Sequence, residues 1–270
     1  MSLILCRHEP VEHPYYIDRL GIHISSSQEL CYIIYNHPLL ALGDFVNDHL
    51  IQFIRDELKQ TFLADKLKAW RRSNEDPDEM LIIILQECYY YTAKEIQKFR
   101  QKLIAYRRMN RMEFMKEKAD YYFSLRQYGA AVHYYEKILE DWRLKSLSDE
   151  FTAAIWNNIG ASYAGIFWFE KAMTAYDMSY NFLKSIDTLK RIYQLTLMNP
   201  ELKLKDRYQS LLTEERKAQW EKEFKEVMEK AAQTEKMSEL TLLFEKDPIR
   251  RSEGMAELLN QWKKEYRMML

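Results

Sequence analysis

Glycine and proline are scarce in this sequence. Only six of each occur among 270 residues, about a third of the combined share that is usual in proteins. Because these residues supply most tight turns, the turns must be few and the regular elements long. A β-sandwich, whose short strands need frequent turns, is therefore disfavoured. A nucleotide-binding loop is also excluded, because the glycines form neither GxGxxG nor GxxxxGK.

Cysteines and long apolar runs are scarce as well. The three cysteines, Cys6, Cys31 and Cys88, have neither the even count of a disulfide framework nor the close pairs of a zinc ribbon. The longest apolar run, residues 80–85, is far shorter than the roughly 18 residues of a membrane-spanning helix. The apolar stretch at 2–6 is too short for a signal peptide. We therefore expect a cytoplasmic protein that does not enter a membrane.

No excess of one charge is present: 40 Lys and Arg balance 41 Asp and Glu, for a net charge of -1. The chain as a whole therefore has no field that attracts nucleic acid or an anionic membrane. Residues 94–118 are an exception, with nine basic and three acidic side chains and a net charge of +6. Such a stretch is usually a solvated helix face, so we do not expect nucleic acid as a partner.

Helical patterns are abundant by contrast. Ser26 with Glu29, and Asn110 with Glu113, have the spacing of capping boxes at helix starts. From residue 80 to residue 106 apolar side chains recur mostly every three or four positions, which predicts one long helix.

The first 25 residues are the exception to this helical pattern. Two short apolar runs, residues 3–6 and 21–24, are separated by Pro10 and Pro14. The sequence predicts that these runs pair as a small β-ribbon.

Two segments, residues 119–139 and 160–180, are similar to each other at an offset of 41 residues. The second copy has Trp156, Ile159, Gly160, Tyr163, Ala172, Tyr176 and Ser179 where the tetratricopeptide repeat (TPR) has Trp, Leu, Gly, Tyr, Ala, Phe and Ala. The first copy matches more loosely through Met115, Ala119, Tyr122, Ala131, Tyr135 and Ile138. The closing proline of the repeat is replaced by Lys184. The chain thus resembles a TPR protein, which implies stacked helix hairpins whose small residues allow close approach.

The remaining segments extend this stack. Residues 185–212 have helical spacing without the repeat residues and are interpreted as a degenerate third unit. Helices that start at Thr213 and Pro248 are predicted to pair as an antiparallel hairpin over the open end. The whole chain also resembles an uncharacterised family of bacterial TPR-like proteins, through residues 14–34 and the closing WKKEYR at 262–267. That resemblance implies a fold and no activity.

These patterns predict an all-α fold, an α-α superhelix of TPR-like hairpins with a small irregular or β-ribbon cap at the N-terminus. Three regions are expected. Residues 1–110 form the N-terminal helical region with its cap, residues 111–212 the TPR-like repeats, and residues 213–270 a C-terminal helical hairpin that packs on the repeats.

The TPR resemblance also implies a binding site. Stacked hairpins present a concave surface lined by their first helices, and some TPR proteins use Lys and Asn there to hold the C-terminal carboxylate of a peptide. The residues predicted to bind a peptide are Lys116, Phe123, Asn157, Asn158, Lys190 and Arg191. Asp120 departs from the pattern, because it stands where Asn is wanted and would repel the carboxylate of the ligand.

Motifs for catalysis are missing, since neither GxSxG nor HExxH occurs. Five of the six histidines lie in the first 49 residues, but their spacing suits zinc poorly. We therefore expect no metal, no cofactor and no enzymatic activity, and predict an interaction module that binds a peptide or partner protein in its groove. Two alternatives stay open: a peptide-sensing regulatory protein, and a nucleic-acid-binding or metal-dependent enzyme.

Overall fold

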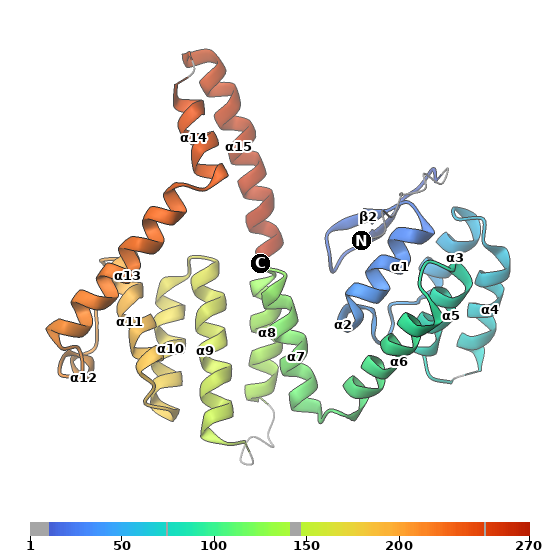
Figure 1. Cartoon of the computed structure of the whole chain (residues 1–270), viewed down its shortest axis with the longest axis horizontal. Helices are drawn as coiled ribbons and strands as arrows, with labels where there is room; N and C mark the ends of the chain where they lie inside the picture. The colour runs from blue at the N-terminus through green and yellow to red at the C-terminus, as the bar shows by residue number, and fades with distance from the viewer. Residues whose placement is uncertain (1–10, 74, 141–146, 246) are drawn as a thin grey trace. The chain divides into compact units, whose positions relative to one another are not determined.

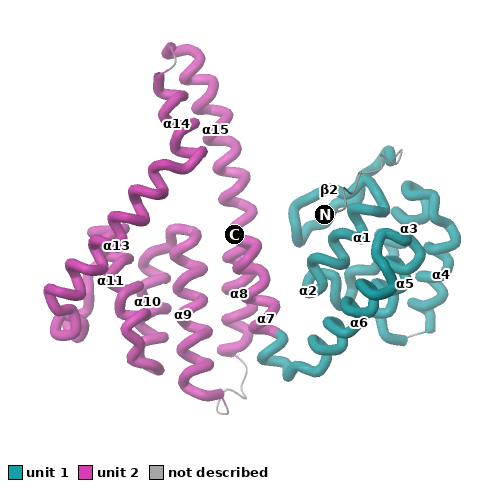
Figure 2. The backbone as a smooth tube through the Cα atoms, viewed as in Figure 1, with its two compact units in different colours: residues 1–114 teal, residues 115–270 magenta. Residues whose placement is uncertain are grey.

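A computed structural model describes residues 11–73, 75–140, 147–245 and 247–270. This part of the chain contains fifteen helices and one two-stranded sheet (Figure 1), which confirms the all-α fold with a small N-terminal β-ribbon. The chain divides into two compact units, residues 1–114 and 115–270 (Figure 2). The predicted C-terminal helices and nearly all of the repeat region fall together in the second unit.

The first unit has a core of helices around α5. Its elements are β1 (Tyr15–Ile17), β2 (Ile22–Ile24), α1 (Ser27–Asn36), α2 (Pro38–Ala41), α3 (Asp48–Asp56), α4 (Thr61–Arg72), α5 (Glu79–Cys88) and α6 (Ala93–Arg108). Six consecutive residues of α5, 80–85, are buried, because α1, α4 and α6 each pack against this helix. An apolar run of this kind is typical of a helix that is surrounded on all sides.

The β-ribbon differs from its prediction. Strand β2 pairs antiparallel with β1, with Tyr15 opposite Ile24, whereas the sequence pattern placed residues 21–24 opposite residues 3–6. Residues 3–6 lie outside the described part of the chain. Pairing with β1 closes only a short loop, which costs little entropy, and Gly21 provides the positive φ of 64° that the turn requires.

Both predicted helix starts are confirmed. The Oγ of Ser26 accepts the N–H of Glu29 at 3.1 Å, and the carboxylate of Glu29 reaches back to the N–H of Ser25 at 2.6 Å. In the same way, Asn110 Oδ1 accepts the N–H of Glu113 at 2.9 Å. These bonds satisfy backbone donors that have no partner within a helix, which is why this pattern marks helix starts so well.

The single helix predicted from residue 80 to residue 106 is wrong. Helix α5 ends at Cys88, where Tyr89 adopts the left-handed conformation with φ of 57°. Thr92 and Glu95 then form a complete capping box that starts α6. The box was present in the sequence, but the apolar spacing across it suggested continuity. The break brings Tyr89, Tyr90 and Tyr91 out of helical geometry.

The second unit is a row of hairpins with a long C-terminal extension. Its helices are α7 (Arg111–Ser124), whose first turn lies in the first unit, α8 (Tyr128–Glu140), α9 (Asp149–Gly165), α10 (Phe169–Phe182), α11 (Ile186–Met198), α12 (Asp206–Gln209), α13 (Glu214–Ala232), α14 (Glu235–Phe244) and α15 (Pro248–Met269). Helices α8, α9, α10 and α11 pack in succession (Figure 1).

The internal repeat is visible in the backbone of the two hairpin turns. Arg126 and Phe167, which lie 41 residues apart, both have positive φ, 59° and 62°. In the first turn the N–H of Gln127 bonds the carbonyl of Tyr122 at 3.0 Å, and in the second the N–H of Trp168 bonds that of Tyr163 at 2.9 Å. The segments that match in sequence therefore also match in local structure.

Small residues mark the close approach of α9 and α10, as predicted. A Cβ added to Gly160 would lie 2.6 Å from Cδ1 of Tyr176, a distance at which the ring would have to move. Ala131 and Ala172 are completely buried. The helices of these hairpins are thus held at a separation that larger side chains would not permit.

The C-terminal segment differs from the predicted hairpin. After α11 comes only the four-residue α12, and α13 packs against α11 through the buried Trp220. Helix α15 pairs with α14 and not, as predicted, with the helix that starts at Thr213. Its last turns reach back to the repeats, where the hydroxyl of Tyr266 bonds the carbonyl of Ile166 at 3.3 Å.

Candidate functional site

The first helices of three successive units, α7, α9 and α11, lie side by side through polar contacts. Asn158 on α9 donates to Asp120 on α7 at 3.1 Å. Arg191 on α11 donates to Asn157 Oδ1 on α9 at 2.6 Å. We call the surface formed by Lys116, Asp120, Asn157, Asn158, Lys190 and Arg191 the first-helix face.

Asp120 is the centre of the α7 end of this face. Its carboxylate accepts hydrogen bonds from Lys116 and from the Tyr135 hydroxyl, both at 2.5 Å, in addition to the one from Asn158. Burial and the neighbouring Asp120 raise the pKa of Tyr135, so that its phenol remains a donor. The carboxylate of Asp120, whose side chain is 35% exposed, thus accepts hydrogen bonds from three donors of the chain itself.

The α11 end of the face is held by α13. Lys190 forms an ion pair with Glu223 of α13, and its side chain is 31% exposed. Arg191 is exposed, and its described partners are uncharged oxygens: Asn157 Oδ1 and the hydroxyl of Tyr176. The pKa of Tyr176 is raised to about 12, chiefly by burial. Of the three cations on the face, Arg191 is the one that no described carboxylate neutralises.

Four of the six predicted residues, Lys116, Asn157, Asn158 and Arg191, are therefore joined by contacts on one surface. Lys190 is next to Arg191 on α11 but pairs with α13. Phe123, the sixth, packs edge-on against Tyr128 with ring centres 5.2 Å apart, and no described contact joins it to the polar residues of the face. Sequence reasoning missed the hydroxyl of Tyr135, although its repeat slot was recognised, because the slot was interpreted as packing only. It also missed Glu223, for which the sequence has no signal, because its position depends on how α13 docks.

A second polar cluster, centred on α10, is structural. Asp177 on α10 accepts hydrogen bonds from Lys205 at 2.8 Å and from the Tyr208 hydroxyl at 2.7 Å, and it also pairs with Arg207. Its side chain is only 10% exposed. The cluster anchors the segment around α12 to α10, which positions the start of α13.

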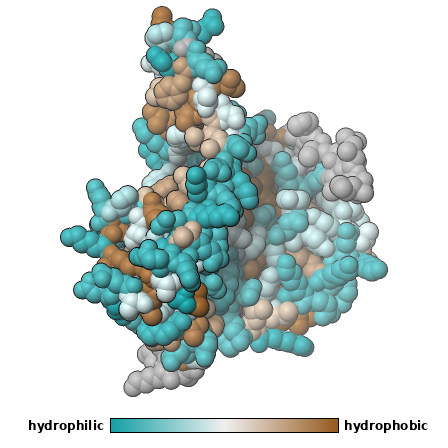
Figure 3. Space-filling view, turned by 60° about the vertical axis from the view of Figure 1, so that its left-hand side comes forward, coloured by the Kyte–Doolittle hydropathy of each residue, from teal (hydrophilic) through white to brown (hydrophobic). Residues whose placement is uncertain are grey.

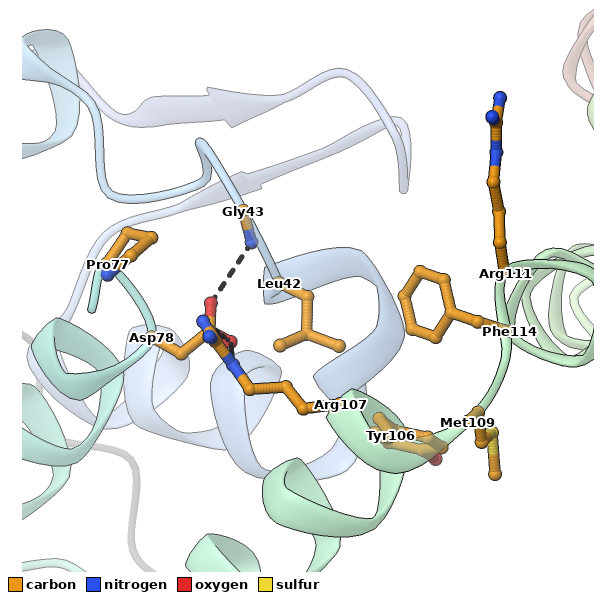
Figure 4. A pocket seen from close by; sticks show the side chains of 9 residues that line it. All are labelled: Leu42, Gly43, Pro77, Asp78, Tyr106, Arg107, Met109, Arg111 and Phe114. Atoms are coloured by element: carbon orange, nitrogen blue, oxygen red, sulfur yellow. Dashed lines mark hydrogen bonds and ion pairs between the residues drawn. The ribbon is translucent and has the colours of Figure 1, made fainter.

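In the first unit, a shallow cavity of about 390 Å³ lies beside the starts of α5 and α7 (Figure 4). Its main polar group is Asp78, whose carboxylate accepts from Arg107 Nε at 2.8 Å and from the backbone N–H of Gly43 at 3.3 Å. Figure 4 shows Arg107 pointing at Asp78, with Leu42 beside this ion pair. These groups satisfy one another's hydrogen bonds, so they have a structural role and need no ligand.

The basic stretch at 94–118 is divided between two helices and partly neutralised. Arg100 forms a bidentate pair with Glu79 at 2.6 Å, and Lys118 lies 5.0 Å from the ring centre of Tyr134. Within the described ranges, no three His, Cys, Asp or Glu side chains gather as metal ligands would. Cys6 and His8, part of the N-terminal cluster noted in the sequence, lie outside those ranges.

Comparison of the chain with protein-family models, with curated proteins and with solved structures finds no match. The class of protein is defined by the fold alone, as an all-α protein with a row of helix hairpins. No helix in the described part of the chain has both the length and the apolar character needed to cross a bilayer.

Proposed function

We propose that this chain is a non-catalytic interaction module whose first-helix face binds an extended segment of a partner protein. The supporting observation is the continuity of this face, which runs across three neighbouring helices through the Asn158–Asp120 and Arg191–Asn157 hydrogen bonds. Three parallel rows of polar side chains offer repeated contacts to the backbone of one extended peptide.

Arg191 is the residue that we propose to bind a carboxylate of the peptide. Lys116 and Lys190 already pair with Asp120 and Glu223, so a ligand carboxylate would have to compete with an internal one there. Arg191 is bonded to neutral oxygens, and a carboxylate can form the stronger charge-assisted pair with it. Among the predicted residues Lys116, Asn158, Lys190 and Arg191, the contact with a ligand carboxylate is thus proposed for Arg191 on α11.

The test uses the full chain, immobilised, and a pool of random octapeptides with free C-terminal carboxylates. We expect a subset of peptides to be retained, and Arg191→Gln to reduce their retention by about tenfold, the usual effect of losing one charge-assisted hydrogen bond. Arg108→Gln, which removes an exposed arginine from α6, is the matched control and should retain the same peptides.

Circular dichroism of each variant shows whether the helices persist. Equal retention by the wild type and by Arg191→Gln would remove the first-helix face as the binding surface. Amidation of the retained peptides tests the ligand side of the same contact, and unchanged retention after amidation would contradict a role for their terminal carboxylate.

A further inference from the structure

The first unit contains a second cavity, of about 560 Å³, that is distinct from the first-helix face. It lies between strand β2, helix α1 and the turn that joins α5 to α6. Four tyrosines, Tyr32, Tyr89, Tyr90 and Tyr91, line it together with isoleucines of β2 and α1. This volume and this mixture of aromatic and aliphatic walls are typical of sites for small organic ligands.

The aromatic wall is a consequence of the break between α5 and α6. The left-handed conformation of Tyr89 and the capping box at Thr92 turn three successive tyrosines out of the helix. Tyr90 is then held by a 3.1 Å hydrogen bond to Ser27, and Tyr91 stacks on Tyr35 with ring centres 4.1 Å apart. Tyr89 remains 84% exposed at the rim. Tyr90 and Tyr91 are therefore held in place before any ligand arrives.

Gln28 provides the cavity with a polar group that needs a partner. The residue is only 8% exposed, and its Oε1 has no hydrogen-bond partner in the part of the chain that the structure describes. More than nine-tenths of buried polar atoms in proteins are satisfied. Gln28 lines the cavity, so a turn of its side chain toward the cavity lets a ligand with an N–H or O–H donor complete this carbonyl oxygen.

The charge of the lining favours a cation. Glu29 contributes a carboxylate, one oxygen of which accepts the N–H of Ser25. Burial lowers the pKa of His37, another residue of the lining, which favours the neutral form of this imidazole. Among the described residues that line the cavity there is no Lys or Arg. The faces of tyrosine rings also attract cations.

We propose that this cavity binds an alkylguanidinium group, which donates N–H bonds to Gln28 Oε1 and lies against the tyrosine rings near Glu29. A guanidinium is planar and has five donors, so it can stack on an aromatic face while it bonds two acceptors. An ammonium ion lacks the flat face that stacking needs. The group can belong to a free small molecule or to an arginine side chain of another protein.

Calorimetry on the full chain with n-butylguanidine and with n-butylurea tests the proposal. The two probes have nearly the same shape, and only the first is charged. We expect n-butylguanidine to bind at least about tenfold more tightly. Equal affinity of the two probes, or no binding of n-butylguanidine, would overturn the proposal.

The role of Gln28 is tested with Gln28→Leu, which removes the acceptor and keeps the size. We expect n-butylguanidine affinity to fall about tenfold, whereas Gln86→Leu, at an exposed position of α5, should leave it unchanged. If Gln28→Leu does not fold, Tyr89→Ala replaces it, because this exposed ring has little part in the core. Full affinity in whichever variant is measured would contradict the site.

The two sources of the group are separated by agmatine, a free guanidine, and by Nα-acetyl-arginine N-methylamide, which represents an arginine within a peptide. Tighter binding of agmatine supports a small-molecule site, and tighter binding of the amide supports capture of an arginine side chain. Both probes should bind less tightly to Gln28→Leu, and independence of Gln28 would count against the cavity.

Discussion

The hairpins α9/α10 and α14/α15 are built from similar helical patterns and differ sharply in what they bury. Helices α9 and α10 bury six residues each. Helix α14 buries only Leu243, and the 22 residues of α15 bury none. Apolar side chains such as Ile249 remain 73% exposed on this hairpin, and Figure 3 shows hydrophobic residues gathered on it. Amphipathic spacing is therefore not sufficient to make a core.

The two hairpins differ in burial because different numbers of helices pack against them. Helix α8 packs against α9 and α11 packs against α10, so each helix of the pair has a second partner. The α14/α15 hairpin touches the repeats near its end, where Trp168 Nε1 donates to the hydroxyl of Tyr266 at 3.2 Å and Leu270 approaches Gly129. A helix gains stability from a tertiary partner more than from its own propensity.

Two tryptophans provide the largest test of this comparison. Trp220 of α13 is 5% exposed and belongs to the core with Tyr193, whereas Trp262 of α15 is 36% exposed. We expect Trp220→Ala to lower the free energy of unfolding by about 3–5 kcal/mol, and Trp262→Ala by less than about 1 kcal/mol. Urea unfolding followed by circular dichroism measures both. Similar losses in the two variants would show that α15 is packed as tightly as α13.

Two glycines test the same contrast at a smaller scale. In Gly160→Ala the new methyl would meet three ring atoms of Tyr176 at 2.6–3.0 Å, and we expect a loss of about 1–3 kcal/mol from overpacking. In Gly254→Ala the methyl would meet only the tip of Leu243 at 2.5 Å, which can rotate away. Here the better helix propensity of alanine should produce a gain of up to about 1 kcal/mol. Melting temperatures that move in the same direction would contradict this reading.

The smallest expected effect is a loss of stability at low pH. Burial alone would raise the pKa of Asp177, but hydrogen bonds from Lys205, Tyr208 and Arg207 outweigh it and lower the pKa below 3.8. A lowered carboxyl pKa stabilises the fold above the unfolded value, and this stability is lost as the pH falls through the folded pKa. We expect the free energy of unfolding to fall by about 1 kcal/mol on acidification below 3.8 because of this group.

Asp177→Asn should remove that part of the acid dependence. Glu265→Gln on α15 is the matched variant, because the pKa of Glu265 is lowered by an exposed pair with Lys236, and salt screens exposed pairs. In high salt, the free energy of unfolding should therefore depend on acid pH in Glu265→Gln as it does in the wild type. In Asp177→Asn this dependence should differ. An unchanged titration of Asp177→Asn would contradict the role of the α10 cluster.

Much of the fold was predictable from local patterns. The capping residues Ser26 and Asn110 act within four positions of themselves, and the repeat around Gly160 has its counterpart in the hairpin turns. The errors occurred where a local pattern was compatible with two outcomes. The apolar spacing ran through Tyr89, whose left-handed conformation ends α5, and the final helix paired with α14 and not with the helix at Thr213.

The candidate sites were predictable in part. Four of the six predicted residues are joined on one face, because the first helices of successive units lie side by side. Their partners were not predictable: the ion pair of Lys190 depends on the docking of α13, and the bond from Tyr135 to Asp120 depends on the approach of α8 to α7. The tyrosine cavity had no signal in the sequence, because it requires β2, α1 and the turn after α5 to meet.

The sequence by itself determined the helical class, the positions of several helix starts and the repeated hairpin, because capping, periodicity and small residues act over a few neighbouring positions. Only the tertiary structure decided which apolar faces are covered, which cations are neutralised, and that Gln28, whose carbonyl oxygen has no described partner, lines a cavity. A side chain becomes buried or paired only when residues distant in the chain meet, and local sequence patterns do not determine which residues meet.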